Sequence, residues 1–436
     1  MLAGLLPMAL SAQQNWKAVV RYDKQAAKTQ MTERLQKYAA QDSHASPSAS
    51  TRPTTKEQLA FGKMLVKELK HVGAANVQIS KEGIVTAEIP ATSTKKLPTI
   101  ALVAHLDTTP DSVAERPQLH AKYTSGDIVL DRAANLRLTE ANSTQLLRAH
   151  GHDFVTSAGN APFGADGKAG LSIIITLADY LLGNTAVQHG PIKLVFLPDS
   201  STHNGAQDVN IDALGAQYAY VLDGQDLGEI TTANFAGRGF TAVFVGRRDI
   251  TLAHAIHSTF TDNLLMASDF HTLLPRQRRP ENTSGSRGYI MVDNILTQGE
   301  KSTVTGYIRA FSDSDMSDLN HQVTQAFETV KAMNPNRKNA TLAFEDQFQN
   351  AQKQIPAVML QNLETALRQE DVQSKRISVR DNTDAAVLTS RGLPAVSVFT
   401  GVFHAKEPLE YADVDVMEAA LRGLLTTVTD WPETNR

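Results

Sequence analysis

The chain has no cysteine among its 436 residues, which excludes thiol catalysis, disulfide scaffolds and cysteine-ligated zinc fingers. It also lacks an apolar run of about 18 residues, the length a helix needs to cross a bilayer. No excess of positive charge is present, because 42 Lys and Arg face 46 Asp and Glu and the net charge is −4. This balance argues against a nucleic-acid partner or a polybasic membrane contact. Any metal ion must therefore be held by His, Asp and Glu.

The length and the apolar content are those of a multidomain globular protein. With 42% hydrophobic residues, the chain can form two or three domains of roughly 150 residues each. Residues 1–12 are apolar and end in small residues, as a signal peptide does, but they lack its basic leading segment. We interpret them as a clipped export signal, as an artefact of the chosen start site or as an ordinary apolar tail.

Strand-like and helix-like segments alternate over most of the chain. Strands are predicted at 76–80, 84–89 and the short apolar run 99–104, and buried strands at 192–197 and 393–400. Helices are predicted at 56–73, 169–182, 355–367 and 415–428. Such alternation predicts an α/β fold with a mixed sheet flanked by helices and joined by crossover connections.

The middle of the chain has a different pattern. Strand candidates at 240–245, 288–293 and 303–311 alternate with helix candidates at 260–273 and 316–332, a βαββα-like order typical of a small α+β domain. We therefore predict an N-terminal extension (1–30), a discontinuous α/β domain (31–235 and 346–436) and an inserted α+β domain (236–345).

The first candidate site follows the predicted strand 99–104. His105 and Asp107 are separated by one residue, so that strand alternation places both on the same side of the chain. In an open α/β sheet, ligands gather at the carboxyl ends of the strands. A metal-ligating histidine usually has a carboxylate on its other ring nitrogen, and Asp107 has the spacing for that task.

Three further candidates follow apolar or glycine-rich segments in the same way. Asp166 lies in the glycine-punctuated turn 164–170 that opens a helix, Asp223 ends an apolar run, and His404 follows the last predicted strand. Each alone has an ordinary structural explanation as a turn or surface residue. Together with His105 they supply the ligand types that a His/Asp metal centre needs.

The joint order of these segments resembles the peptidase T family, tripeptide aminopeptidases within a larger group of zinc exopeptidases and deacylases. The resemblance runs from about Met31 to the C-terminal region and rests on segments 104–111, 163–170, 219–224, 307–309, 382–384, 392–394 and 399–401. It implies a zinc metallo-aminopeptidase that removes the N-terminal residue of short peptides.

The resemblance also implies roles for the candidate metal ligands. In the family two zinc ions share a bridging aspartate, and a glutamate activates the water between them. His105 and Asp223 would hold the first ion, with Asp107 orienting His105. Asp166 would bridge the ions, followed by a cis peptide bond, and His404 would be a ligand of the second ion.

Substrate contacts and assembly are implied as well. His257 matches a histidine that helps to polarise the scissile carbonyl, often from a neighbouring subunit. Arg309 and Asn382 fall in substrate-contacting segments. The inserted domain would serve as a lid and mediate a homodimer. A cytoplasmic location is implied, with export as the alternative if residues 1–12 are part of a signal.

The sequence departs from the family at the catalytic glutamates. The family has Pro-Asp-Glu-Glu where this chain has Pro198-Asp199-Ser200-Ser201. Ser200 stands in place of the general base, and losing such a base typically costs about 10²–10⁴-fold in rate. Ser201 stands in place of a glutamate ligand, so that one zinc ion is expected and the second is in doubt. Asp199 should point elsewhere, and His203 would need a remodelled loop to substitute.

Smaller departures surround the same region. The family's Asp-Asp-Lys turn is Asp166-Gly167-Lys168 here, and its Gly-Gly before Thr-Asp is Asp381-Asn382. Glu410 follows His404 by six residues, a longer spacing than in the family. Three interpretations result: a weakened aminopeptidase, an inactive relative that binds peptides or amino acids, or another amidohydrolase or deacylase. The sequence alone does not decide whether the protein turns over substrate.

Overall fold

The computed structural model describes residues 22–202, 204–246, 262–334 and 340–431. Contacts along the chain divide it into two compact units. Unit 1 comprises 1–230, 355–376 and 391–436, and unit 2 comprises 231–354 and 377–390. No helix within the described ranges combines the length and the apolar character needed to cross a membrane.

Unit 1 contains six whole strands of an eight-stranded sheet, whose strands β10 and β15 begin in unit 1 and end in unit 2. The sheet has the order β1-β2-β8-β3-β9-β16-β10-β15. Its strands are β1 (Ala75–Ile79), β2 (Val85–Ile89), β3 (Ile100–His105), β8 (Ile192–Leu197), β9 (Tyr218–Gly224), β10 (Glu229–Asn234), β15 (Lys375–Val379) and β16 (Ala395–Phe399). Strands β8, β3, β9 and β16 run parallel, whereas β1 and β2 are antiparallel to their neighbours. The predicted mixed α/β sheet is therefore confirmed.

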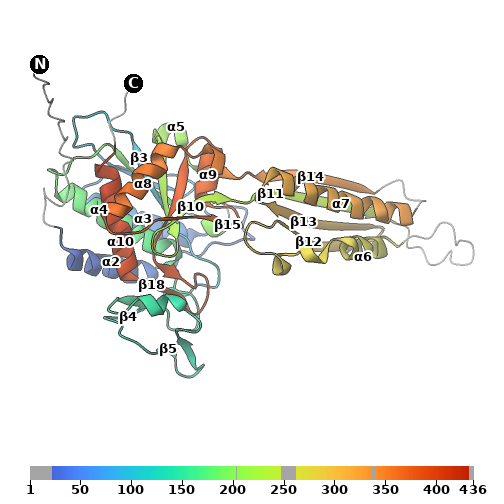
Figure 1. The fold of residues 1–436 in the computed structure, drawn as a ribbon, viewed down its shortest axis with the longest axis horizontal. Helices are drawn as coiled ribbons and strands as arrows, with labels where there is room; N and C mark the ends of the chain where they lie inside the picture. The colour runs from blue at the N-terminus through green and yellow to red at the C-terminus, as the bar shows by residue number, and fades with distance from the viewer. Residues whose placement is uncertain (1–21, 203, 247–261, 335–339, 432–436) are drawn as a thin grey trace, which may run out of the picture. The chain divides into compact units, whose positions relative to one another are not determined.

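Helices of unit 1 lie along this sheet (Figure 1). They are α2 (Lys24–Ala39), α3 (Lys56–His71), α4 (Ala165–Gly183), α5 (Ile211–Leu214), α8 (Ala357–Gln369) and α10 (Val414–Thr429). All six residues of β3 are buried, as expected for a parallel strand covered on both faces. One large apolar cluster joins α2, α4, α8 and α10 to the sheet. The sequence predicted these helices except α2 and the short α5.

Two small sheets complete unit 1, and the sequence did not predict them. One has the strand order β17-β18-β7-β4, and the other pairs β5 with β6. Their strands are β4 (Gln118–His120), β5 (Ile128–Asp131), β6 (Leu136–Leu138), β7 (Phe154–Thr156), β17 (Val402–Phe403) and β18 (Tyr411–Asp413). Strands this short carry too few residues for a period-two pattern to be visible.

The described part of unit 2 contains an antiparallel sheet with the order β12-β13-β11-β14 (Figure 1) and three α-helices. Its elements are β11 (Ala236–Val245), α6 (Asn263–Leu273), β12 (Tyr289–Gln298), β13 (Lys301–Ala310), α7 (Asp313–Met333), β14 (Thr341–Phe348) and α9 (Asp384–Ser390). Residues of α6 and α7 share one apolar core with the strands. The predicted βαββα order is present, followed by β14, which was not predicted.

Candidate metal centre

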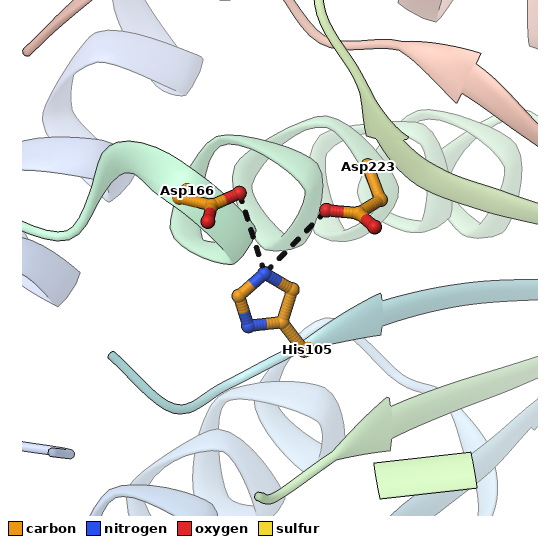
Figure 2. A group of neighbouring side chains, drawn as sticks. All are labelled: His105, Asp166 and Asp223. Carbon is orange, nitrogen blue, oxygen red and sulfur yellow. Dashed lines mark ion pairs between the residues drawn. The ribbon is translucent and has the colours of Figure 1, made fainter. Parts of the chain in front are cut away.

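Three candidate ligands converge at the carboxyl ends of neighbouring strands of unit 1. His105 ends β3, Asp223 lies near the end of β9, and Asp166 lies in the first turn of α4. Nε2 of His105 is 3.5 Å from Oδ1 of Asp166 and 3.6 Å from Oδ1 of Asp223, and both carboxylates point toward the imidazole (Figure 2). One donor atom from each residue lies within 4.8 Å of the other two.

Asp107 holds the imidazole in this orientation. Its Oδ1 lies 3.2 Å from Nδ1 of His105, and the residue is completely buried. The same carboxylate accepts hydrogen bonds from the backbone N–H groups of Ser200 (3.0 Å) and Ser201 (2.8 Å). Because Nδ1 is engaged by Asp107, Nε2 is the nitrogen that faces Asp166 and Asp223.

The electrostatics of this cluster favour a positive charge at its centre. Burial alone would lower the pKa of His105, but contacts with the surrounding aspartates raise that pKa well above its usual value. Burial likewise acts to raise the pKa of the Asp166 carboxyl, whereas the charges of His105 and Lys406 hold it well below its usual range. One imidazole and two carboxylates form a donor set that fits a divalent cation.

Lys406 is a second cation beside the cluster, and the sequence did not single it out. Its Nζ lies 3.4 Å from Oδ2 of Asp166. The charge of Asp166 raises the pKa of Lys406 above its usual value. The two oxygens of Asp166 thus have different partners, His105 on one side and the Lys406 ammonium on the other.

The turn that presents Asp166 depends on Gly167. Both residues leave helical geometry, with φ −54° and ψ 117° at Asp166 and φ +82° at Gly167, a region that glycine enters without cost. A Cβ at position 167 would lie 2.5 Å from Cε1 of His105 and 2.6 Å from its carbonyl oxygen. Among the described residues the cis peptide bond is Arg52–Pro53, so the expected cis bond after Asp166 is absent; glycine with positive φ makes the turn instead.

Replacing Gly167 by alanine is therefore expected to displace His105 and to weaken binding of zinc about 10–100-fold, as loss of a supporting contact to a ligand typically does. Competition with a chromophoric chelator measures this affinity. Gly183→Ala, at the other end of α4, is the matched control, because a Cβ there meets nothing within 4 Å. Equal zinc affinities of the two variants would contradict the prediction.

Glu410 holds the same turn from the other side. Its buried carboxylate accepts backbone hydrogen bonds from Phe163 (2.9 Å), Gly164 (2.8 Å), Ala165 (3.1 Å) and Asp166 (3.4 Å). Burial, together with the charge of Asp166, raises the pKa of Glu410 to about 7. The sequence analysis noted only the longer spacing between His404 and Glu410. The available signal for a buried role was that this acid directly precedes the apolar residues that begin β18.

Known proteins are similar to this chain over nearly its whole length. No family model matches the chain. The peptidase T of Caldanaerobacter subterraneus subsp. tengcongensis is 30% identical over 406 residues, which cover 92% of this chain and 98% of the relative. This chain belongs to the peptidase T family. The peptidase T of Bacillus cereus (strain Q1) is 31% identical over 404 residues, 91% of this chain and 97% of the relative.

Solved structures share the fold of this member of the peptidase T family. The aminopeptidase PepT from Bacillus cereus has a TM-score of 0.70 and 16% identity, and the tripeptidase from Staphylococcus aureus has 0.68 and 15%. In both comparisons the match covers 92% of this chain and 98% of the other. The predicted family and fold are confirmed.

The remaining peptidase T positions in unit 1 lie outside the donor group. His404 has φ +51°, and its Nδ1 lies 3.1 Å from Oε2 of Glu407. Asp199 is buried and turned away, since its carboxylate accepts hydrogen bonds from Thr54 and Gln58. The prediction that Asp199 points elsewhere is confirmed. His203 and His257 lie outside the described residues.

The two peptidase T positions expected to contact substrate lie in unit 2. The Arg309 guanidinium lies between the rings of Tyr307 and Phe348, 4.2 and 4.7 Å from their centroids. Asn382 follows Asp381, whose Oδ1 is 3.8 Å from Nε of Arg309. Oδ1 of Asn382 is buried, and no described group hydrogen-bonds to it.

A second group of ligand-type residues, His152, Asp413 and Asp415, also has donor atoms within 4.8 Å of one another. Lys28 already supplies positive charge there, with Nζ 2.8 Å from Asp415. Asp413 caps the N-terminus of α10 through the N–H groups of Asp415 and Val416. We therefore interpret this group as a structural link between α2 and α10.

Proposed function

We propose that this chain is a metallo-aminopeptidase that removes the N-terminal residue of short peptides, tripeptides in particular. The observation that carries the proposal is the convergence of His105, Asp166 and Asp223 on one point, with Asp107 fixing the imidazole. The names of its relatives, peptidase T, aminopeptidase and tripeptidase, support the same reaction.

The three residues would hold a divalent ion, and the His/Asp donor set suits zinc. Such an ion, when bound, polarises a peptide carbonyl as a Lewis acid and lowers the pKa of water. The chain contributes the orientation of the ligands. Asp107 keeps the proton of His105 on Nδ1, and Glu410 fixes the backbone that presents Asp166.

We propose one ion per chain rather than two. The position that would supply a charged ligand to a second ion holds Ser201, a neutral hydroxyl. Oδ2 of Asp166, the oxygen that does not face His105, lies beside the Lys406 ammonium. The imidazole of His404 contacts the carboxylate of Glu407. A positive side chain beside Asp166 opposes a second divalent cation at that oxygen.

Slow turnover follows from the same region. The hydroxyl of Ser200 is a poor base near neutral pH. Asp199, the nearest acid along the chain, is committed to Thr54 and Gln58. Proton removal from the attacking water is therefore unassisted by a carboxylate from this segment.

Family membership supports three further parts of the proposal. Arg309 and Asn382 contact the peptide, and His257 assists at the scissile carbonyl. The protein is a homodimer, which sedimentation or size-exclusion measurements test. It acts in the cytoplasm, where cell fractionation would find it.

Metal content and hydrolysis of trialanine together test the proposal. Wild-type protein is expected to retain about one zinc ion per chain and to cleave slowly, since one ion alone brings the pKa of water to about 7. His105→Ala should lose both properties, whereas His71→Ala, an exposed histidine at the end of α3, should lose neither. Wild-type protein that binds zinc but stays silent would favour the inactive, peptide-binding alternative. Failure to bind zinc would contradict the proposal altogether.

A further inference from the structure

We infer that Asp381 makes the Arg309 contact selective for a neutral amide group instead of a carboxylate. Among the short peptides of the proposed function, the protein then prefers those that present an amide to Arg309, either a tripeptide with a C-terminal carboxamide or a slightly longer peptide with an internal peptide bond there. The inference rests on the proposed function, in that Arg309 contacts the peptide. It adds the chemistry of the group that is recognised there.

Arg309 is a rigid, partly satisfied donor. The residue is 9% exposed, and its guanidinium is fixed between two aromatic rings, those of Tyr307 and Phe348. Nη1 donates to Oε1 of Gln347 at 2.8 Å and to the carbonyl of Ile308 at 3.2 Å. Nε is buried and has no hydrogen-bond partner among the described residues. An arginine with donors to spare would by itself favour a carboxylate, which its planar fork matches.

Asp381 changes that preference. Its Oδ1 lies 3.8 Å from Nε of Arg309, which is close enough for an ion pair and too far for a hydrogen bond. The aspartate therefore offsets the arginine's charge without using the Nε proton. Its side chain is 57% exposed, and a carboxylate has room for several donors.

A second arginine lies in the same unit but is engaged elsewhere. Arg380 donates to the carbonyl and the hydroxyl of Thr283. Its guanidinium lies over the rings of Tyr289 and Phe235, 5.1 and 5.7 Å from their centroids. These hydrogen bonds of Arg380 are thus directed at Thr283. Asp381 instead lies near Nε of Arg309, which has no hydrogen-bond partner among the described residues.

Asn382 adds a group that both donates and accepts. Its buried side-chain oxygen has no hydrogen-bond partner among the described residues, and an amide offers an acceptor and two donors whichever way it is turned. The site thus combines a hydrogen-bond donor from Arg309, an anionic acceptor from Asp381 and an amide from Asn382.

A carboxylate and an amide meet this set differently. A carboxylate can accept from Arg309, but it has no proton to give and places its charge beside that of Asp381. An amide accepts from Arg309 through its oxygen and donates to Asp381 through its N–H, so that both the arginine donor and the aspartate acceptor are paired. A buried polar group left unpaired is the main penalty in such discrimination.

Equilibrium binding to the zinc-loaded full-length protein tests the inference with three probes: trialanine, trialanine carboxamide and tetraalanine. Wild-type protein is expected to bind the carboxamide about tenfold more tightly than trialanine, an effect at the low end of what like-charge contacts cost. Asp381→Asn should tighten trialanine about tenfold and leave the carboxamide unchanged. Tetraalanine binding as tightly as the carboxamide would identify an internal peptide bond as the recognised group; weaker binding would identify the terminal carboxamide.

Two further variants make the outcome specific. Asp346→Asn also removes one negative charge from unit 2, but Asp346 is paired with Arg238. This variant should therefore discriminate between trialanine and trialanine carboxamide as wild-type protein does. Arg309→Gln should weaken all three probes. If Arg309→Gln weakens binding while Asp381→Asn leaves the discrimination unchanged, the inference is overturned and the proposed function stands. If no probe binds, or if Arg309→Gln binds the probes as wild-type protein does, Arg309 does not contact the peptide. Both the inference and this part of the proposed function would then be wrong.

Discussion

Replacing Ser200 and Ser201 together by glutamate is expected to raise the rate of tripeptide hydrolysis by about 10²–10⁴-fold, the usual contribution of a positioned general base. The glutamate at 200 would take the proton of the attacking water. The glutamate at 201 would add a charged ligand for a second metal ion, and its negative charge would offset the positive charge of Lys406. Initial rates on trialanine at saturating zinc measure the effect.

The backbone at these positions is fixed where new carboxylates would be useful. The N–H groups of Ser200 and Ser201 both donate to Asp107, and the same carboxylate contacts Nδ1 of His105. The residues open a short 3-10 turn, 200–202, and the hydroxyl of Ser200 packs closely against Gly205.

The matched control is Ser200→Gln/Ser201→Gln, which has the same bulk without basicity or charge. Its rate should stay at the wild-type level, and its zinc content should stay at about one ion per chain, whereas a second ion is expected with Ser201→Glu because carboxylates are zinc ligands. A glutamate variant that folds and binds zinc but cleaves no faster than the glutamine variant would refute the role assigned to this segment.

Removing the Glu410 carboxylate should have the largest effect on stability. Glu410→Ala leaves five backbone N–H groups without their acceptor, those of residues 163–166 and that of Lys406, in a region where the glutamate is completely buried. Each buried donor left unpaired costs about 1–3 kcal/mol, so the free energy of unfolding should fall by about 3 kcal/mol or more even if water replaces part of the loss. Urea denaturation monitored by circular dichroism measures it.

Two variants separate this effect from a general loss of charge. Glu410→Gln keeps one acceptor oxygen and should be intermediate. Glu407→Ala removes an acid three residues earlier whose side chain is 59% exposed, and surface changes of this kind usually stay within about 0.5 kcal/mol. Similar losses for Glu407→Ala and Glu410→Ala would contradict the role of Glu410 in holding the Asp166 turn.

The sequence was most informative where a regular element ends at a functional residue. The apolar run 192–197 coincides with β8, and the run before His105 predicts β3 to within one residue. Because parallel strands end at one edge of a sheet, the positions of His105 and Asp223 already indicated that their side chains meet. The missed helix α2 has a polar sequence, and only its buried spacing, Met31, Leu35 and Tyr38, marks the face that packs.

Residues on irregular backbone could not be found in this way. Lys406 follows β17 in a segment where His404 and Lys406 both have positive φ. Because this backbone is neither helix nor strand, no regular repeat predicts which way its side chains point. The partner of Asp381 likewise depends on the pairing of distant segments, since Arg309 lies 72 residues earlier on β13. Such contacts follow from tertiary structure rather than from local pattern.

Gly167 makes part of this divergence from the family difficult to reverse. The family has an aspartate at this position, but in this chain any Cβ there would collide with His105. Two codon changes could return glutamates to 200 and 201, whereas an aspartate returned to 167 must come with a rebuilt turn. Natural selection for faster hydrolysis would therefore meet strong epistasis, in which the ancestral residue is harmful until its surroundings have changed. A lineage that carries this glycine would reach faster hydrolysis along a mutational route other than simple restoration of the family residues.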